Sequence, residues 1–275
     1  MIKFRSFLAL LAFAILPIGA AAQYSEMTPT PAPVAAPNAH NGPRISYSAA
    51  NVDGPYIALT FDDGPSKTTT PRLLDLLAKR GVKVTFFVQG VNAHEFPEII
   101  KREVAEGHEI GNHTWDHPNL AKMSESAVRS QLERTQAVIF QITGQKPKVF
   151  RPPFGSFSEK QRKWANEQFG FKIILWEVDP LDWKRPGSAV VAQRILTNTK
   201  AGYIVLAHDI HAPTVDAMAE TVDGLLAKGF KFVTVSELIA MDHPKPKPAT
   251  PAPSTTGSSS VTPAASAAPT AAAVP

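Results

Sequence analysis

Short apolar segments alternate with amphipathic segments along most of this chain, and that alternation constrains its fold more than any other feature. Seven segments have the β-branched and aromatic residues typical of buried strands: 57–61, 83–88, 108–111, 148–151, 171–178, 203–207 and 230–235. Helical spacing of apolar residues fills the stretches between them: 71–79, 97–106, 124–143, 158–170, 188–200 and 215–228. Strands that alternate with helices predict an α/β fold with a parallel sheet, either doubly wound or closed as an incomplete barrel.

The two ends of the chain lack this alternation. Met1–Ala22 has Lys3 and Arg5, then an uncharged apolar run and three alanines, which is the pattern of a secretory signal peptide cleaved after Ala22. We therefore expect a secreted or periplasmic protein. Proline- and alanine-rich stretches leave one folded domain between a linker and a disordered tail, with these predicted bounds: linker Gln23–Asp53, domain Gly54–Asp242, tail His243–Pro275.

Composition excludes several classes of function. The chain has no cysteine, which excludes disulfides, thiol chemistry and lipid attachment through a cysteine. Its formal net charge is +4, but Lys3, Arg5, Lys245 and Lys247 account for +4 and the linker sums to −1, so the folded domain carries only about +1. A net charge this small does not indicate a basic surface for binding nucleic acid. The apolar run near the N-terminus is too short and too interrupted by proline and glycine to span a membrane.

Polar residues follow five of the predicted strands at the point where each strand ends. Asp62 and Asp63 follow the first strand, and the others follow the third, fourth, fifth and sixth strands: His113, His117, Arg151, Asp179 and His208. Parallel β/α folds place their active sites at the carboxyl ends of the strands. We therefore expect these side chains to meet on one rim of the fold.

His113 and His117 are spaced one helical turn apart, which would put both imidazoles on one face. Two histidines and one carboxylate form a ligand set suited to a catalytic zinc ion. The carboxylate would come from Asp62 or Asp63, the only candidates after the first strand. Whichever of them binds the metal leaves the other beside it as a general base.

In these residues the chain resembles the NodB-homology polysaccharide deacetylases, carbohydrate esterase family 4. The resemblance covers roughly Tyr56 to Leu238, and all five motifs of that family occur in order: Thr60–Pro65, His113–His117, Arg151–Gly155, Asp179–Trp183 and Leu206–His208. It implies a distorted (β/α)7 barrel and a metal-dependent N-deacetylase, with Zn²⁺ as cofactor and Co²⁺ or another divalent metal as a substitute.

The resemblance also implies a role for each motif residue. Asp62 would be the general base, and the metal ligands would be Asp63, His113 and His117. His208 would be the general acid, while Arg151 would position the catalytic residues and pair with Asp179. Substrate contacts would come from the backbone of Phe154 at the oxyanion, from Trp183 on the groove wall, and from Leu206 at the acetyl methyl group. Phe154 departs from the tyrosine that many members have.

Three functions are compatible with this pattern. The first is removal of N-acetyl groups from N-acetylglucosamine units of peptidoglycan or chitin-type glycans. The second is an acetylxylan-type O-acetyl esterase, and the third is an inactive carbohydrate-binding domain. The third is disfavoured because every catalytic position holds a competent residue. The expected partner is a polysaccharide, with no nucleic acid and no membrane span, and we expect a monomer.

Several other residues receive weaker interpretations. Exposed aromatic residues in the rim loops would suit sugar stacking, with a place in the core as the alternative for each, and the candidates are Trp115, Phe154, Phe157 and Trp183. Asn112 and Asp182 would shape the groove or be structural, and His211 is interpreted as loop structure. The remaining histidines are assigned no function: His40, His94, His108 and His243.

Overall fold

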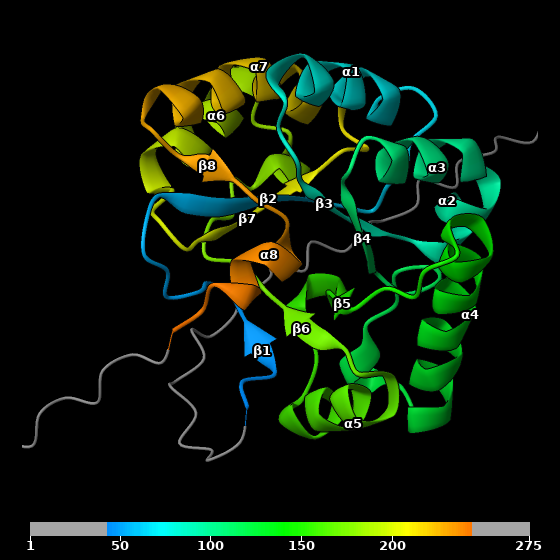
Figure 1. Ribbon diagram of the computed structural model, residues 1–275. Coiled ribbons are helices and arrows are strands. Elements are labelled where there is room, and N and C mark those ends of the chain that lie inside the picture. Colours follow the sequence, from blue (N-terminus) through cyan, green and yellow to red (C-terminus); the bar gives the residue numbers. More distant parts are fainter. Residues whose placement is uncertain (1–42, 244–275) are drawn as a thin grey trace, which may run out of the picture.

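The computed structural model describes residues 43–243, which form a curved sheet of eight strands with helices around its outer side (Figure 1). The strands are β1 Ser46–Tyr47, β2 Tyr56–Asp62, β3 Thr85–Val88, β4 Glu109–Asn112, β5 Val149–Phe150, β6 Lys172–Ile174, β7 Ile204–His208 and β8 Lys231–Phe232. The α-helices are α1 Thr70–Arg80, α2 Gly90–Glu95, α3 Pro97–Ala105, α4 Glu125–Thr143, α5 Glu159–Phe169, α6 Ser188–Asn198, α7 Ala212–Ala227 and α8 Val235–Ala240. Three 3-10 turns complete the set: η1 Leu120–Lys122, η2 Pro153–Gly155 and η3 Asp182–Lys184.

All strand pairs in the sheet are parallel. The order is β1-β6-β5-β4-β3-β2-β7, and β8 pairs with the beginning of β2. The segment after β1 reaches across to the other edge, where Ala49 forms an isolated bridge with Tyr203 before β7. The predicted parallel α/β sheet is therefore confirmed, in its incomplete-barrel form.

The strand β2 is the centre of the fold. Only its first residue is partly exposed, because β3 and β7 flank it and helices cover the sheet. Its outward face packs into the largest apolar cluster, where Leu59 and Phe61 meet Leu73 and Leu77 of α1. Truncation of a buried leucine such as Leu59 to alanine typically costs about 2–5 kcal/mol of stability.

Local sequence signals determine where helices such as α5 begin and end. The predicted capping box opens α5, where the Ser158 hydroxyl accepts the N–H of Gln161 and the Gln161 amide oxygen accepts the N–H of Ser158. Gly170 ends the same helix at a φ of 73°, a conformation that glycine adopts without steric cost. The other helices that were expected from periodicity also form, within a few residues of their predicted ends.

Four expectations about the elements were wrong. The folded part begins before Gly54, because β1 pairs with β6 through Ser46 and Ile173. The short helix α2 was not predicted, and Val235 begins α8 although it was assigned to the last strand. The strand expected over 171–178 ends at Ile174.

The predicted signal peptide and most of the predicted linker and tail lie outside the described residues. Within residues 43–243, no helix is both long and apolar enough to cross a membrane.

Candidate active site

The predicted rim residues come together at the carboxyl end of β2. Register pairs Asp62 with His208 of β7 on one side and with Phe87 of β3 on the other. The chain leaves the strand at Asp63, whose φ of 75° is not an extended conformation. The Asp63 side chain therefore does not follow the alternation of strand side chains between the two faces of the sheet. The two neighbouring carboxylates can thus serve the same site from different directions.

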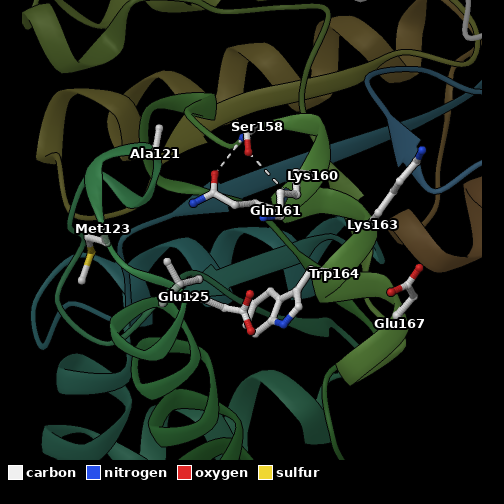
Figure 2. A pocket seen from close by; sticks show the side chains of 10 residues that line it. Ala121, Met123, Glu125, Ser158, Lys160, Gln161, Lys163, Trp164 and Glu167 are labelled. Carbon is white, nitrogen blue, oxygen red and sulfur yellow. Dashed lines mark hydrogen bonds between the residues drawn. The ribbon is translucent and has the colours of Figure 1, made fainter.

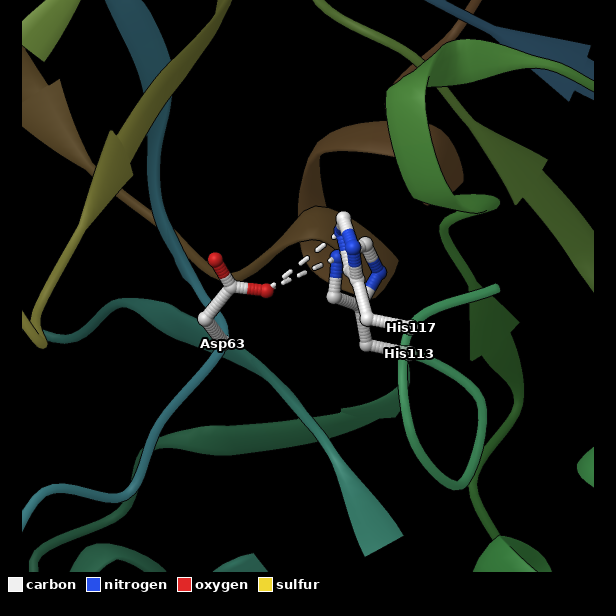
Figure 3. A group of neighbouring side chains, drawn as sticks. All are labelled: Asp63, His113 and His117. Atoms are coloured by element: carbon white, nitrogen blue, oxygen red, sulfur yellow. Dashed lines mark ion pairs between the residues drawn. The ribbon is translucent and has the colours of Figure 1, made fainter. Parts of the chain in front are cut away.

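Asp63, His113 and His117 form a compact group of donor atoms (Figure 3). The Nε2 atoms of His113 and His117 each lie 3.5 Å from Asp63 Oδ1, and all three donor atoms lie within 4.8 Å of one another. Ligands bonded to zinc at about 2.0–2.1 Å in tetrahedral geometry stand about 3.3–3.5 Å apart. The spacing of this group therefore fits a bound divalent ion.

The hydrogen bonds around the group also fit a metal ligand set. His113 Nδ1 lies 2.7 Å from the carbonyl oxygen of Arg151, so Nδ1 carries the proton and Nε2 is left as the donor atom. Asp63 Oδ1 accepts a hydrogen bond of 2.8 Å from the Gln89 amide, and the Asn92 amide holds the Asp63 carbonyl at 2.7 Å. Gln89 and Asn92 were not predicted from the sequence.

The pKa shifts within the group differ in direction and in cause. Burial opposes ionisation of Asp63, but the hydrogen bond and charge of His113, then the charge of His117, hold the pKa of Asp63 well below its ordinary value. Burial lowers the pKa of His113, yet the charges of Asp62 and Asp63 raise it overall. Burial and the neighbouring His113 lower the pKa of His117 to about 4. A cation bound here would replace the proton of His113.

Asp62 is held by Arg151, the largest fully buried side chain among the described residues. Arg151 Nη1 donates to Asp62 Oδ1 and to the Thr60 hydroxyl, both at 2.7 Å. Asp62 Oδ2 lies 3.7 Å from His113 Nε2. The residues alone left open which aspartate joins the histidines; the geometry places Asp63 with them and leaves Asp62 beside the group.

The expected pair between Arg151 and Asp179 was wrong. Among residues 43–243 no hydrogen bond or ion pair joins these two side chains, because Arg151 is turned toward Asp62 and toward the carbonyl of Leu175. Asp179 instead accepts the N–H of Leu181 at 2.7 Å and shapes the turn before η3.

His208 has a different carboxylate partner, Asp182. Its Nδ1 lies 2.8 Å from Asp182 Oδ1, and its backbone N–H donates to Asp182 Oδ2 at 2.8 Å. The Thr214 hydroxyl donates to the same Oδ2 at 2.9 Å. Burial lowers the pKa of His208, but the hydrogen bond and charge of Asp182, with further contributions from Asp62 and Asp63, raise it to about 9. His208 is therefore an imidazolium at neutral pH, with Nε2 as its remaining donor.

Another buried aspartate, Asp209, supports the loop after Asp63. A Cβ atom added to Gly64 would overlap the Asp209 carboxylate, so this position requires glycine. The Thr70 hydroxyl donates to Asp209 Oδ2 and accepts the backbone N–H of Ser66 at 2.7 Å. The strand–aspartate–glycine pattern was visible in the sequence, but Asp209 carries no signal that identifies this role.

Non-glycine residues with positive φ are concentrated on the same rim. They belong to the loops after β2, β4, β5 and β6: Asp63, Thr114, His117, Phe154, Leu181 and Arg185. Such conformations cost free energy and persist where the surrounding structure fixes them. At His117 the φ of 62° brings the imidazole back toward His113, and the two rings lie 5.0 Å apart between their centroids. Asn112, one of the residues left open, fixes this loop by accepting the N–H of Thr114 at 2.8 Å.

The aromatic residues divide into two groups. Phe154 is 60% exposed and packs edge to face on His117 at 4.6 Å, and Trp183 is 36% exposed. Phe157 is buried against Phe150, and the partly buried Trp115 packs on the apolar core and on Arg134, so for these two the core alternative holds.

Leu206 and the remaining histidines also have defined places. Leu206 is buried in β7 opposite Thr60, and His211 lies 6.0 Å from His208 between ring centroids. His108 is buried and accepts the N–H of Val84. His94 packs on Trp115, and His243 lies 3.0 Å from Asp53. His40 lies outside the described residues.

A cavity of about 460 Å³ opens between η1, the beginning of α4 and α5 (Figure 2). Its wall includes the Ser158–Gln161 capping box, and the residues around it are Ala121, Met123, Glu125, Val128, Ser158, Lys160, Gln161, Lys163, Trp164 and Glu167. None of the predicted site residues lines this cavity.

Comparison with known proteins agrees with the geometry of the site. Residues 49–174 match the family model described as polysaccharide deacetylase. A peptidoglycan-N-acetylglucosamine deacetylase of Bacillus cereus is 43% identical over 193 residues, which cover 67% of this chain and 70% of that protein. The peptidoglycan-N-acetylglucosamine deacetylase PgdA of Listeria monocytogenes is 44% identical over 182 residues, but the match spans 66% of this chain and only 38% of that protein.

Comparison with solved structures points to the same family. The crystal structure of the Bc1960 peptidoglycan N-acetylglucosamine deacetylase superposes with a TM-score of 0.69 at 38% identity, and the match covers 73% of this chain and 96% of that one.

Proposed function

Because this chain belongs to the polysaccharide deacetylase family, the NodB-homology enzymes of carbohydrate esterase family 4, we propose that it removes N-acetyl groups from N-acetylglucosamine units of peptidoglycan or a chitin-type glycan, releasing acetate. The enzyme is a hydrolase of carbon–nitrogen bonds outside peptides. The observation that supports this most strongly is the placement of Asp62 and His208 on neighbouring strands beside the Asp63, His113 and His117 donor group.

The donor group would hold a divalent cation, for which we propose Zn²⁺, with Co²⁺ as a functional substitute. Such a cation would polarise the acetamido carbonyl and acidify the attacking water. The Asp63 carboxylate and the two Nε2 atoms would supply its ligands, and the Arg151 carbonyl holds His113 in the tautomer that this requires.

In this proposal Asp62 is the general base. Arg151 fixes one of its oxygens at 2.7 Å, and the other oxygen faces the donor group, 3.7 Å from His113 Nε2. A water molecule bound between Asp62 and the acetamido carbonyl could pass its proton to that second oxygen as it attacks. Arg151 thus acts by positioning: without it, Asp62 could rotate out of line and its buried charge would lack a partner.

In this proposal His208 is the general acid. Its pKa of about 9 keeps it protonated at neutral pH, and Asp182 fixes the ring through both Nδ1 and the backbone N–H. Nε2 can then give its proton to the sugar nitrogen as the carbon–nitrogen bond breaks. An amide needs this step because an unprotonated amine anion is a poor leaving group, whereas many esters need it less.

The test is acetate release from peptidoglycan, N-acetylglucosamine oligomers and acetylxylan, measured side by side with wild-type protein and Asp62→Asn. We expect release from one or both amide substrates and none from the variant. Release from acetylxylan alone would instead establish an O-acetyl esterase, and release from none of them would favour a binding domain.

We also propose that the protein acts outside the cytoplasm, after cleavage behind Ala22. The supporting pattern lies entirely in the sequence of residues 1–22, which is outside the described residues. An N-terminal sequence of the mature protein that begins at Gln23 would agree with this proposal, and an intact Met1 on exported protein would contradict it.

A further inference from the structure

The loop that carries η3 is joined rigidly to the candidate general acid. Asp182 binds the His208 ring and backbone and also the Thr214 hydroxyl, and its own carboxylate is fully buried. Arg194 also fixes the beginning of the loop, because its Nη1 donates to the carbonyl of Pro180 at 2.8 Å. Side chains that leave this loop outward are therefore held at a fixed place relative to the reacting amide.

Three consecutive residues of this loop are exposed: Trp183, Lys184 and Arg185. The Lys184 Nζ atom lies 4.9 Å from the centroid of the Trp183 ring. Arg185 has a φ of 54° and ends η3 with its N–H bonded to the Asp182 carbonyl at 2.8 Å. This turn therefore exposes an aromatic ring and two cationic side chains that are consecutive in the chain.

The two cations are unpaired, and they follow directly in the chain on Asp182, the carboxylate that holds His208. Arg185 contributes to the lowered pKa of His211, whose ring lies 6.0 Å from that of His208, and Lys184 lies within electrostatic reach of Asp179. Within residues 43–243, neither the Lys184 nor the Arg185 side chain forms an ion pair or a hydrogen bond. The Asp182 carboxylate of the same loop is already paired with His208.

We infer that Lys184 and Arg185, together with the Trp183 ring, form a subsite for a carboxylate on the glycan beside the acetamido group that is hydrolysed. This inference rests on the proposed function and narrows its substrate class to anionic glycans. A sugar ring can lie on an exposed indole, while a carboxylate is the natural partner of two unpaired cations. Chitin and xylan backbones built only of neutral sugars offer no such group. Peptidoglycan offers two, the lactyl carboxylate of muramic acid and the carboxylates of its peptide.

The test compares three tetrasaccharides of equal length with metal-loaded full-length protein. One contains only N-acetylglucosamine, one alternates it with peptide-free muramic acid, and one carries the peptide. The variant Lys184→Gln with Arg185→Gln should raise KM about 3- to 30-fold on carboxylate-bearing glycans, because each exposed ion pair contributes modestly. Its kcat on the same glycans should change less than KM. The effect in wild-type protein should also shrink at high salt.

Two further variants serve as controls. Lys146→Gln with Lys148→Gln removes the same charge at the opposite end of the barrel, before β5, and should leave all kinetic constants unchanged. Lys184→Arg with Arg185→Lys keeps both charges and should restore the wild-type KM, which a merely structural role of the loop would not predict.

The outcomes are distinguishable. A raised KM on the peptide-free muramic acid glycan identifies the lactyl carboxylate, and an effect confined to the third glycan identifies the peptide; both support the subsite. Equal KM changes on the neutral and anionic glycans, or no change on any, would overturn it while the deacetylase function stands. If wild-type protein releases acetate from none of the three, the proposed function itself fails.

Discussion

Replacing Asp182 by asparagine tests the account of the general acid. Asp182 supplies the hydrogen bond and the charge that contribute most to raising the pKa of His208 to about 9 from its ordinary 6.5. Asp62 and Asp63 contribute less, and each lies beside a basic side chain of its own, Arg151 for Asp62 and His113 for Asp63. Burial then dominates in the variant, and the pKa of His208 should fall to 6.5 or lower. The shift corresponds to about 3 kcal/mol between the two protonation states.

The assay is the pH dependence of acetate release from an N-acetylglucosamine oligomer. At pH 8 a histidine of pKa 9 is about 90% protonated, whereas one of pKa 6.5 is about 3% protonated. Asp182→Asn should therefore lose at least about 30-fold in kcat at pH 8, and its alkaline limb should move down by about two pH units or more. Asp179→Asn is the matched control, because Asp179 bonds the Leu181 N–H rather than His208.

The pH dependence of the unfolding free energy tests the direction of the His208 pKa shift independently of activity. Because the folded pKa of His208 is raised, this interaction stabilises the wild-type protein fully below pH 6.5 and is lost as the pH rises from 6.5 to about 9. The difference in unfolding free energy between wild-type and Asp182→Asn should therefore shrink over that window. An alkaline limb that stays near pH 9 in Asp182→Asn, or moves equally in Asp179→Asn, would refute the reasoning.

Three further outcomes are expected. His208→Ala should bind metal but lose about two to four orders of magnitude in turnover on an amide and far less on an activated aryl acetate; equal losses would exclude the general-acid role. Gly64→Ala should lower the melting temperature and acetate release because its methyl group meets the Asp209 carboxylate, and Asp209→Ala in the same chain should recover part of both; a fully active Gly64→Ala would show that the loop tolerates the methyl group. Removal of residues 23–42 and 245–275 should leave melting temperature and turnover on a soluble oligosaccharide nearly unchanged; loss of folding would show that an end packs on the domain.

The sequence was sufficient for the position of the site because two simple patterns coincide there. Strand-like runs that end in Asp62 and His208 place those residues on the carboxyl rim of any parallel sheet. The spacing of His113 and His117 brings the imidazoles together, although a positive φ at His117, rather than a regular helix, achieves it. These patterns are local in the sequence. Because every parallel β/α fold brings the carboxyl ends of its strands to one edge, they are enough to predict where the site lies.

The partners within the site could not be predicted in the same way. Asp179 and Asp182 stand three residues apart in one loop, and only the left-handed turn at Leu181 decides that Asp182 faces His208. The pairing of β1 with β6 was missed because a two-residue strand carries no periodic signal and joins residues far apart in the sequence. Such long-range choices depend on packing that local propensity does not encode.

The most direct test of the account is the metal content and the acetate release of the same protein samples. We expect one divalent ion per chain in wild-type protein, loss of both metal and activity after exhaustive chelation, and recovery of activity with zinc or cobalt. Asp62→Asn should keep the ion and release no acetate, whereas His113→Ala and His117→Ala should lose the ion. Undiminished acetate release from metal-free wild-type protein would contradict the central claim that Asp63, His113 and His117 hold a catalytic cation beside Asp62.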